Sequence, residues 1–519
     1  MSSKFLKQSL VAASMVTLIA NILSRFFGFA REAVIANYFG TSSNLDAFIL
    51  AFTIPELIVT VILTALPPAL IPSLKELTSY SDDRDGGKFW SGFIIVAIPF
   101  IVLSFAIYVF RGSIMRFLDP QAQGIWMMTG RRILALSSYY IFFRALESYF
   151  RSWLYLKKHF IIPAFSNIVM NIIILISVMI LYRKYDIISL AYGWLYASII
   201  LFACSGYSVI KVVKPEFKIV LRSPWLRLLI HSLAIIIAVE SISLAYPLVD
   251  RYLAAKWLGP GQISALRYAS VLFQIPVGIF VTTINIAALP WITEYSVPSR
   301  TDNLMKIHYE TIRLIIFGMG LICIGMVVYS PELVRIAFQR GVFDKTSMQL
   351  TVEPFIFYTI GIVFHSIYIF QMRFYYARPA LLRLGLILTI MLIIKVVLSL
   401  VLVGPMENRG LALATSLTWV SGMIILSLDL RRNIVQSSEN LQLPFYLKIL
   451  TSLSLVTIFW LLSKKLWLAD EGLDFLSSLI RLGTLAAIGA ALYFGCAHVL
   501  GLREPRRVLT PLLAKFVKK

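Results

Sequence analysis

The chain has 519 residues, of which 59% are hydrophobic and only 14% charged, and its mean hydropathy is +0.82. A soluble globular domain has roughly 25% charged residues, so the composition excludes that class and indicates an all-α polytopic membrane protein. We assign the net charge of +22 to cytoplasmic loops that face anionic membrane lipids, and we expect no nucleic-acid partner. The 3 cysteines are dispersed through apolar segments and match neither a disulfide framework nor a metal site.

The first apolar segment, residues 9–36, contains the most informative residues of the chain, namely Arg25, Arg31 and Glu32. A charge at bilayer depth costs at least about 2.5 kcal/mol, so three charges in one span indicate a water-filled cavity. Arginine binds phosphate oxygens in pairs, which favours an anionic cargo with a diphosphate group. The alternative is that Arg25 and Glu32, seven residues apart on one helical stripe, only pair to hold helices together.

Asp46 opens the second predicted helix after a short polar link. One interpretation is that its carboxylate complements the dipole of its own helix. The other is that it pairs with Arg25 or Arg31 and orients that arginine. Glu56 follows Pro55, where a kink is expected, and is a further candidate to face the cavity.

A membrane-spanning helix needs about 20 mostly apolar residues, and this rule predicts about 14 spans. They lie near residues 9–36, 45–72, 90–110, 129–155, 160–182, 187–210, 226–250, 264–291, 308–330, 349–376, 380–403, 410–430, 444–463 and 475–500. With the N-terminus inside, the loops assigned to the cytoplasm carry about twice as many Lys and Arg as the others, which places both termini in the cytoplasm. The clearest basic clusters are Lys211, Lys214, Lys218 and Arg222, and the tail with Arg503, Arg506, Arg507, Lys515, Lys518 and Lys519.

Short motifs recur along the chain at nearly constant spacing. Phe39-Gly40, Ile54-Pro55 and Leu66-Pro67 recur as Leu258-Gly259, Ile275-Pro276 and Leu289-Pro290. We therefore predict two six-helix lobes, residues 1–215 and 216–435, followed by two extra helices and a basic tail in residues 436–519. Parallel repeats of this kind place a substrate site near the membrane midplane, at the interface between the lobes.

Charged residues also mark the second predicted lobe. Arg267 in the eighth span is a candidate for substrate binding, and Asp250 in the seventh is a candidate for ion coupling. Lys395 lies in the middle of an apolar run and needs a partner or water, for which Asp250 and Glu240 are candidates. We expect Arg144 and Glu147, three residues apart, to form an ordinary intrahelical pair.

Catalytic signatures are missing from the sequence. It contains no Ser-His-Asp arrangement, phosphate loop or metal-ligand spacing. We therefore expect a transporter without a cofactor or a metal ion, and not an enzyme.

The opening of the chain resembles that of the MviN/MurJ family, lipid II flippases of the multidrug/oligosaccharidyl-lipid/polysaccharide exporter superfamily. The resemblance rests on residues 24–32, on Tyr38-Phe39-Gly40 and on Asp46-Ala47-Phe48. Weaker similarities are Ala337 to Asp344, Val403-Gly404-Pro405 and Gly410-Leu411-Ala412, in the family's order.

This resemblance implies roles for particular residues. Arg25 and Arg31 would contact the diphosphate of a lipid-linked substrate, Glu32 and Asp46 would be their acidic partners, and the last two helices would form a groove for the polyprenyl tail. The chain departs from the family at Ile58-Val59-Thr60-Val61, where a pair of arginines is usual, and at Val271, one turn after Arg267. The family's cation site takes carboxylates from helices seven and eleven, and helix eleven here offers Lys395. We hypothesise that its ammonium group substitutes for a bound sodium ion.

These observations predict a flippase of the bacterial inner membrane that moves a polyprenyl-diphosphate-linked saccharide by alternating access. Lipid II and a related precursor of an exported polysaccharide both remain open as cargo, and coupling to membrane potential, protons or sodium remains open as well. Envelope-synthesis enzymes are possible further partners. The competing interpretations are a multidrug or cation antiporter of the same superfamily and a scaffold that transports nothing. An acidic cavity and 12 helices would be typical of the antiporter.

Overall fold

The computed structural model consists of α-helices joined by turns in the part of the chain that it describes. That part comprises residues 10–75, 85–120, 123–213, 217, 219, 223–294, 301–376, 380–433, 443–467 and 475–505. Several members of the predicted basic clusters lie outside these residues, namely Lys214, Lys218, Arg222 and the tail from Arg506 onward. The chain divides into two compact units, Met1–Ser264 with Arg340–Asp344, and Ala265–Gln339 with Lys345–Lys519.

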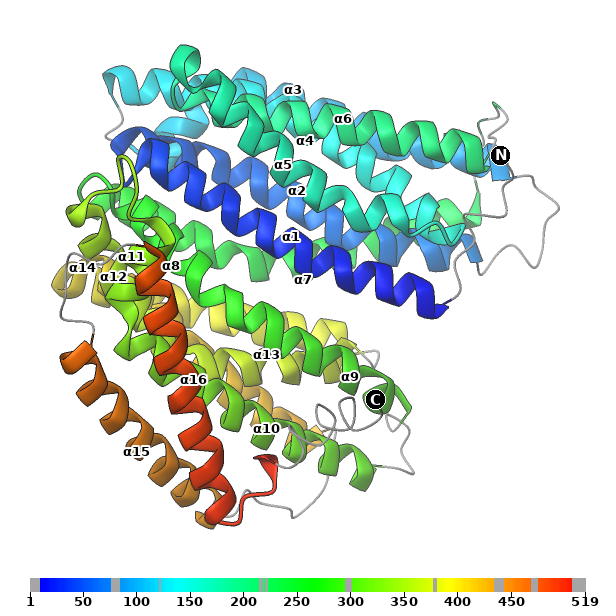
Figure 1. Ribbon diagram of the computed structural model, residues 1–519. Coiled ribbons are helices and arrows are strands. Elements are labelled where there is room, and N and C mark those ends of the chain that lie inside the picture. Colours follow the sequence, from blue (N-terminus) through cyan, green and yellow to red (C-terminus); the bar gives the residue numbers. More distant parts are fainter. Residues whose placement is uncertain are drawn as a thin grey trace. The chain divides into compact units, whose positions relative to one another are not determined.

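The first unit is a bundle of long helices, drawn in blue to green in Figure 1. They are α1 (Leu10–Phe39), α2 (Ser43–Lys75), α3 (Asp85–Leu118), α4 (Gly124–Leu156), α5 (Ile161–Tyr185), α6 (Ile188–Val213) and α7 (Pro224–Trp257). Helix α2 packs against α4 and α7, α4 also packs against α3 and α6, and α5 packs against α1 and α6. A buried aromatic cluster that includes Phe89, Tyr149, Trp153 and Trp225 joins α3, α4 and α7.

The second unit contains the remaining helices. They are α8 (Gln262–Pro276), the π-helix η2 (Val277–Val281), α9 (Thr282–Glu294), α10 (Thr301–Val328), α11 (Ser330–Phe338), α12 (Lys345–Ile360), α13 (Ile362–Tyr376), α14 (Leu381–Asn433), α15 (Leu443–Trp467) and α16 (Phe475–Val499). The first turn of α8 belongs to the first unit. Helices α12 and α13 pack on α14, and α10 packs on α13 and α15.

The number of membrane spans differs from the predicted number. Ten helices of the described residues are long and apolar enough to cross a membrane, or eleven if the bent pair α12 and α13 is one span, so the predicted 14 is not confirmed. One reason is that α14 covers two predicted spans, joined at Glu407, whose φ of 53° is not helical. The predicted lobe boundaries at residues 215 and 435 stay a prediction, and α7 packs within the first unit.

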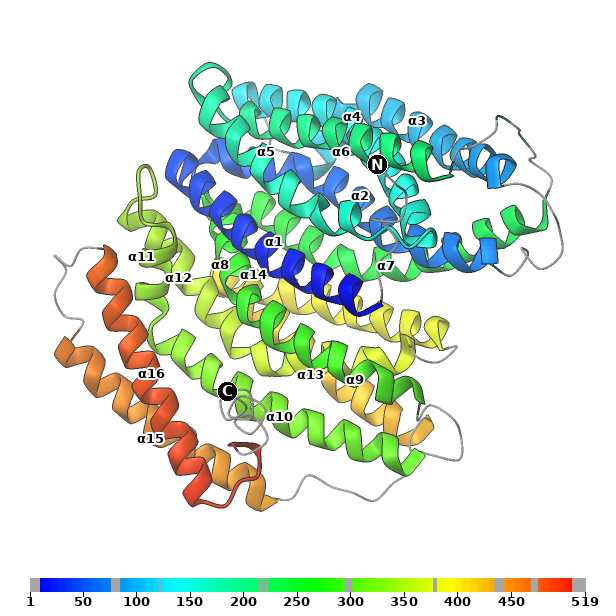
Figure 2. The same cartoon turned by 45° about the vertical axis from the view of Figure 1, so that its right-hand side comes forward.

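The last two helices, α15 and α16, lie side by side in both ribbon views (Figures 1 and 2). Trp460 of α15 fills the contact, and its indole N–H donates to the Leu485 carbonyl of α16 over 3.0 Å. Tyr493 of α16 donates its hydroxyl to the Phe317 carbonyl of α10 over 3.0 Å. These buried aromatic side chains attach the two helices to α10, so they belong to the second unit's core.

A methyl group at Gly489 is expected to disrupt this contact. The Cβ of Gly489→Ala would overlap the Trp460 indole, and overpacking of this kind costs about 1–3 kcal/mol. Gly483→Ala in the same helix is the control, because its Cβ meets nothing within 4 Å. Thermal unfolding of the purified full chain should show a lower melting temperature for Gly489→Ala alone, and equal melting of the two variants would contradict the packing described.

Candidate functional site

A polar cluster surrounds Arg31 in the first unit. One guanidinium nitrogen, Nη1, donates to Asn171 Oδ1 of α5 over 2.9 Å, and Nη2 donates to Glu32 Oε1 over 2.5 Å. The guanidinium carbon lies 5.2 Å from the centre of the Trp194 ring of α6, a cation–π distance. The Asn171 side chain in turn donates to the Ser24 carbonyl of α1 over 3.2 Å. Arg31 is therefore held by groups from three helices, and its side chain is only 15% exposed.

The sequence identified Arg31 and Glu32 but not Asn171 or Trp194, which come from distant segments. A Cβ at Gly28 would lie 3.5 Å from the Asn171 amide nitrogen, an ordinary van der Waals distance. Arg31 Nε is buried and has no hydrogen-bond partner among the described residues. The Nε–H group of Arg31 therefore remains without an acceptor in that part of the chain.

Arg25 lies on the same helix, about 9 Å of helical rise from Arg31. Its side chain is exposed, and it forms no hydrogen bond or ion pair with any described residue. The alternative pairing of Arg25 with Glu32 is therefore not formed in this structure, since Glu32 accepts from Arg31 instead. The Arg25 guanidinium is therefore accessible to an anion.

A second ion pair joins α2 to α7. Arg251 Nη1 donates to Glu56 Oε2 over 2.9 Å and to the Thr53 hydroxyl over 3.0 Å. Both charged side chains keep partial exposure, 19% for Arg251 and 33% for Glu56. Glu56, suspected from the neighbouring proline, is thus neutralised by an arginine of another helix.

Asp46 has a partner that neither interpretation of the sequence anticipated. Its Oδ2 accepts from the Gly261 N–H over 2.6 Å and its Oδ1 accepts from the Ser264 N–H over 2.7 Å. These amides belong to the N-terminus of α8, where a helix has unsatisfied donors and a positive dipole end. A carboxylate of α2, only 2% exposed, therefore caps a helix more than two hundred residues away in the chain.

Two glycines with positive φ bring further backbone to the turn between α1 and α2. Gly261 has φ +87°, and a Cβ there would lie 2.6 Å from the Thr41 carbonyl oxygen. Gly341 has φ +56°, and a Cβ there would overlap the Asn37 carbonyl. The next amide, of Val342, donates to that same carbonyl over 3.0 Å. Gly341 and Val342, which belong to the stretch Ala337 to Asp344 noted in the sequence, thus lie against the C-terminal end of α1 within the first unit.

The predicted pair of Arg144 and Glu147 forms, with a distance of 3.0 Å, but it is part of a larger buried network. Arg151 also donates to Glu147, over 3.4 Å, and Ser166 of α5 donates to its other oxygen over 3.5 Å. Arg144 is 2% exposed and Glu147 is fully buried. The spacing of three residues predicted the Arg144–Glu147 pair, whereas the contacts of Glu147 with Arg151 and Ser166 were not predicted.

In the second unit, Lys395 is completely buried. Its ammonium group donates to the Thr415 hydroxyl over 2.5 Å and to the Leu411 carbonyl over 3.2 Å. Both acceptors lie in the part of α14 after Glu407, so the lysine ties the two halves of this helix together. The acceptors are oxygen atoms of the type that bind a monovalent cation.

The remaining candidates have simpler placements. Asp250 is buried in α7 of the first unit, and Arg267 is half-buried in α8 of the second. The pairing of Asp250 with Lys395 stays a prediction. Within the described ranges, no group of three or more His, Cys, Asp and Glu is placed to hold a metal ion.

Solved structures show what class of protein this fold defines. A lipid II flippase MurJ in an inward closed conformation superposes with a TM-score of 0.76 and 22% identity, covering 92% of this chain and 99% of that one. An inward-facing multidrug resistance MATE family transporter of the MOP superfamily gives a TM-score of 0.63 and 11% identity, covering 81% and 98%. The chain therefore shares the fold of these two solved structures.

Sequence comparison then assigns the family. The family model described as "Lipid II flippase MurJ" matches residues 35–479, and the chain belongs to this family. A probable lipid II flippase MurJ of Borreliella burgdorferi is 24% identical over 509 residues, 95% of this chain and 97% of the relative. A probable lipid II flippase MurJ of Buchnera aphidicola subsp. Baizongia pistaciae is 27% identical over 521 residues, 96% and 97%. The lipid II flippase MurJ of Thermosipho africanus is 25% identical over 420 residues, 80% and 85%.

Removing the charge of Asp46 is expected to loosen the start of α8. Asp46→Asn keeps one accepting oxygen but loses the anion, and a cap of this kind contributes about 0.5–2 kcal/mol. Maleimide labelling of a cysteine introduced by Gln262→Cys should become faster when Asp46→Asn is added.

The control is Ser42→Ala, because the Ser42 hydroxyl accepts from the Leu45 N–H and so caps α2 itself. This change should leave the labelling rate at residue 262 unaltered. Equal acceleration by both changes would show that the effect comes from α2 and not from the bond to α8.

Proposed function

We propose that this chain is a flippase that carries a polyprenyl-diphosphate-linked saccharide across the bacterial inner membrane by alternating access, with both termini in the cytoplasm. The observation that carries the proposal is the arginine pair of α1, in which Arg31 is fixed by Asn171 and Glu32 while Arg25 is exposed. Membership of the lipid II flippase family supports the same cargo class. The activity is transport and not catalysis.

The geometry suits a diphosphate for electrostatic reasons. Arg25 brings a positive charge without a partner among the described residues, and Arg31 has a buried Nε donor without one. Arg31 is held in place and Arg25 is exposed about 9 Å of helical rise away, so the Arg25 side chain can turn toward Arg31 and the two can grip two phosphate groups. Glu32 keeps Arg31 in place when no substrate is bound, and it limits the net charge that the membrane must accommodate.

The antiporter alternative needs acidic groups that are free to bind a cation or a proton. In the first unit, Glu32 accepts from Arg31, Glu56 from Arg251, and Glu147 from Arg144 and Arg151. Each of these carboxylates is therefore already neutralised by an arginine. This charge balance favours an anionic cargo over a cationic drug.

The coupling of transport follows from Lys395. Its ammonium group occupies a position between the Leu411 carbonyl and the Thr415 hydroxyl, where a small cation would also find oxygen ligands. In the proposed cycle this fixed charge replaces a bound sodium ion, and the membrane potential drives reorientation, because one charge crossing 100 mV is worth about 2.3 kcal/mol. Enzymes that make the precursor at the cytoplasmic face are the further partners that such a cycle requires.

Complementation of a bacterium depleted of its lipid II flippase tests the cargo and the arginines together. The wild-type chain should restore growth, whereas Arg25→Ala and Arg31→Ala should lower viable counts by at least about tenfold, since each removes a charge-assisted contact. Arg116→Ala, an exposed arginine in the last turn of α3, is the matched control and should rescue fully.

The outcomes separate two parts of the proposal. Rescue by well-expressed Arg25→Ala and Arg31→Ala would contradict the arginine grip. Failure of a well-expressed wild type would assign the chain to another lipid-linked saccharide.

Sodium dependence tests the role of Lys395. Translocation by the wild type in proteoliposomes should proceed equally in sodium chloride and choline chloride, because the lysine side chain is part of the chain and already occupies the position. Lys395→Gln should lower the rate in choline and recover part of it in sodium, as an ion enters the vacated position. A saturable response of the wild type to sodium would overturn this role.

A further inference from the structure

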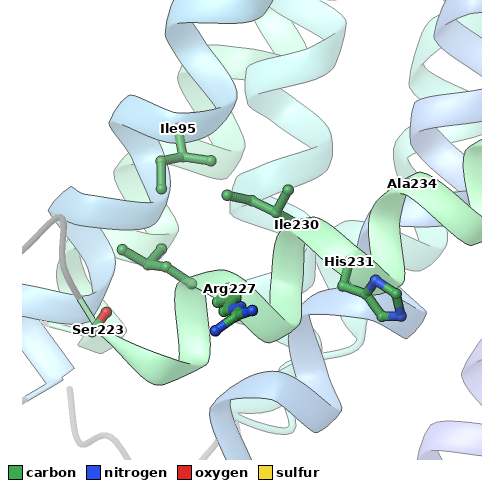
Figure 3. A pocket seen from close by; sticks show the side chains of 7 residues that line it. Ile95, Ser223, Arg227, Ile230, His231 and Ala234 are labelled. Carbon is green, nitrogen blue, oxygen red and sulfur yellow. The ribbon is translucent and has the colours of Figure 1, made fainter.

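A groove of about 610 Å³ lies between α3 and α7 of the first unit. Its lining comes from one residue of α3 and a stripe along α7, namely Ile95, Ser223, Leu226, Arg227, Ile230, His231 and Ala234. Figure 3 shows Ile95 on one helix facing Ile230 on the other, with Arg227 and His231 following each other along α7. The groove shares no residue with the charged cluster of α1 and α2, so the proposed transport cycle leaves it unused.

The first turns of α7 have one buried side and one exposed side. Trp225, Leu226 and Leu229 are buried in the aromatic core with Phe89. Gly92 of α3 permits this close packing, because a Cβ there would lie only 3.1 Å from the Trp225 ring. The opposite side of α7 turns away from the core, and its Arg227, Ile230, His231 and Ala234 are exposed.

The place of the lining residues within α7 indicates how deep the groove lies in the membrane. Helix α7 has 34 residues, whereas about 20 residues cross the hydrocarbon core. Arg227 and His231 lie in its first and second turns, which therefore reach the headgroup layer. Ile95 and Ile230 lie beside them, and α3 continues into the membrane with an exposed apolar face formed by Ile98, Ile101, Val102 and Phe105.

The polar end of the groove is suited to an anion. Among the described residues, neither Arg227 nor His231 has a hydrogen-bond or ion-pair partner. The Ser223 hydroxyl is buried and also lacks a partner in that part of the chain. The lining contains no carboxylate, and it includes the N-terminal end of α7, where the helix dipole is positive.

We propose that this groove binds an anionic phospholipid of the surrounding bilayer. Arg227 and the His231 imidazole N–H hold the phosphate, the Ser223 hydroxyl donates to it, and an acyl chain lies over Ile95 and Ile230 toward the exposed face of α3. Basic pockets between membrane helices recognise lipid headgroups in this way. The bound lipid fills the space between α3 and α7 and so stabilises the first unit, independently of which saccharide is carried.

Native mass spectrometry of the full chain, purified in detergent and titrated with phosphatidylglycerol or phosphatidylcholine, tests the site. The wild type should retain phosphatidylglycerol preferentially. The double variant Arg227→Gln with His231→Gln should lose at least about fivefold in affinity for phosphatidylglycerol and little for phosphatidylcholine. Bound phosphatidylglycerol should also raise the melting temperature of the wild type more than that of the double variant.

Arg116→Gln is the matched control, since it removes one exposed arginine at the opposite end of α3. It should bind phosphatidylglycerol like the wild type. Arg227→Lys keeps the charge and should retain most of the binding. This result would show that the double variant loses affinity because the contact with the anion is lost, and not because the protein misfolds.

Three results would overturn the proposal. These are wild-type affinity in the double variant, an equal loss in Arg116→Gln, and displacement of phosphatidylglycerol by millimolar inorganic phosphate, which would identify a site for a free anion. None of these measurements involves the saccharide carrier, so failure here is distinct from failure of the proposed transport function.

Discussion

The high cost of burying a charge among apolar helices shapes the first unit. Three carboxylates of this unit show how the charge is compensated: Glu32 pairs with Arg31, Glu56 pairs with Arg251, and Asp46 accepts from backbone amides at the start of α8. Because the partners often come from different helices, compensating the charge also fixes which helices are neighbours. In a bilayer, where lipid tails are as apolar as side chains, such polar contacts contribute much of the specificity of helix packing.

These contacts differ in how easily they can be exchanged. The network around Glu147 is buried and includes groups of α4 and α5, so it holds these two helices together. The contacts of Arg31 and Arg251 retain partial exposure, and both involve guanidinium groups that an anion can compete for. The first unit thus contains buried ion pairs beside ion pairs that keep partial exposure, within one set of helices.

The sequence predicted those features that depend on local pattern. Long apolar runs indicated the helices, three charges within one run indicated a polar site on α1, and the spacing within α4 indicated the Arg144–Glu147 pair. It did not reveal Asn171, Trp194 or the α8 amides that bind Asp46, because each lies more than a hundred residues from its partner. The span count differed partly because two predicted spans, 380–403 and 410–430, both fall within α14, which is interrupted at Glu407 by a non-helical φ of 53°.

The turn between α1 and α2 shows a different kind of constraint. Its contacts at Gly261 and Gly341 are made by backbone atoms, and no side chain fits between them. The Arg31 cluster therefore depends on the polar groups of particular side chains, whereas the turn depends on main-chain atoms and on the lack of a Cβ at Gly261 and Gly341.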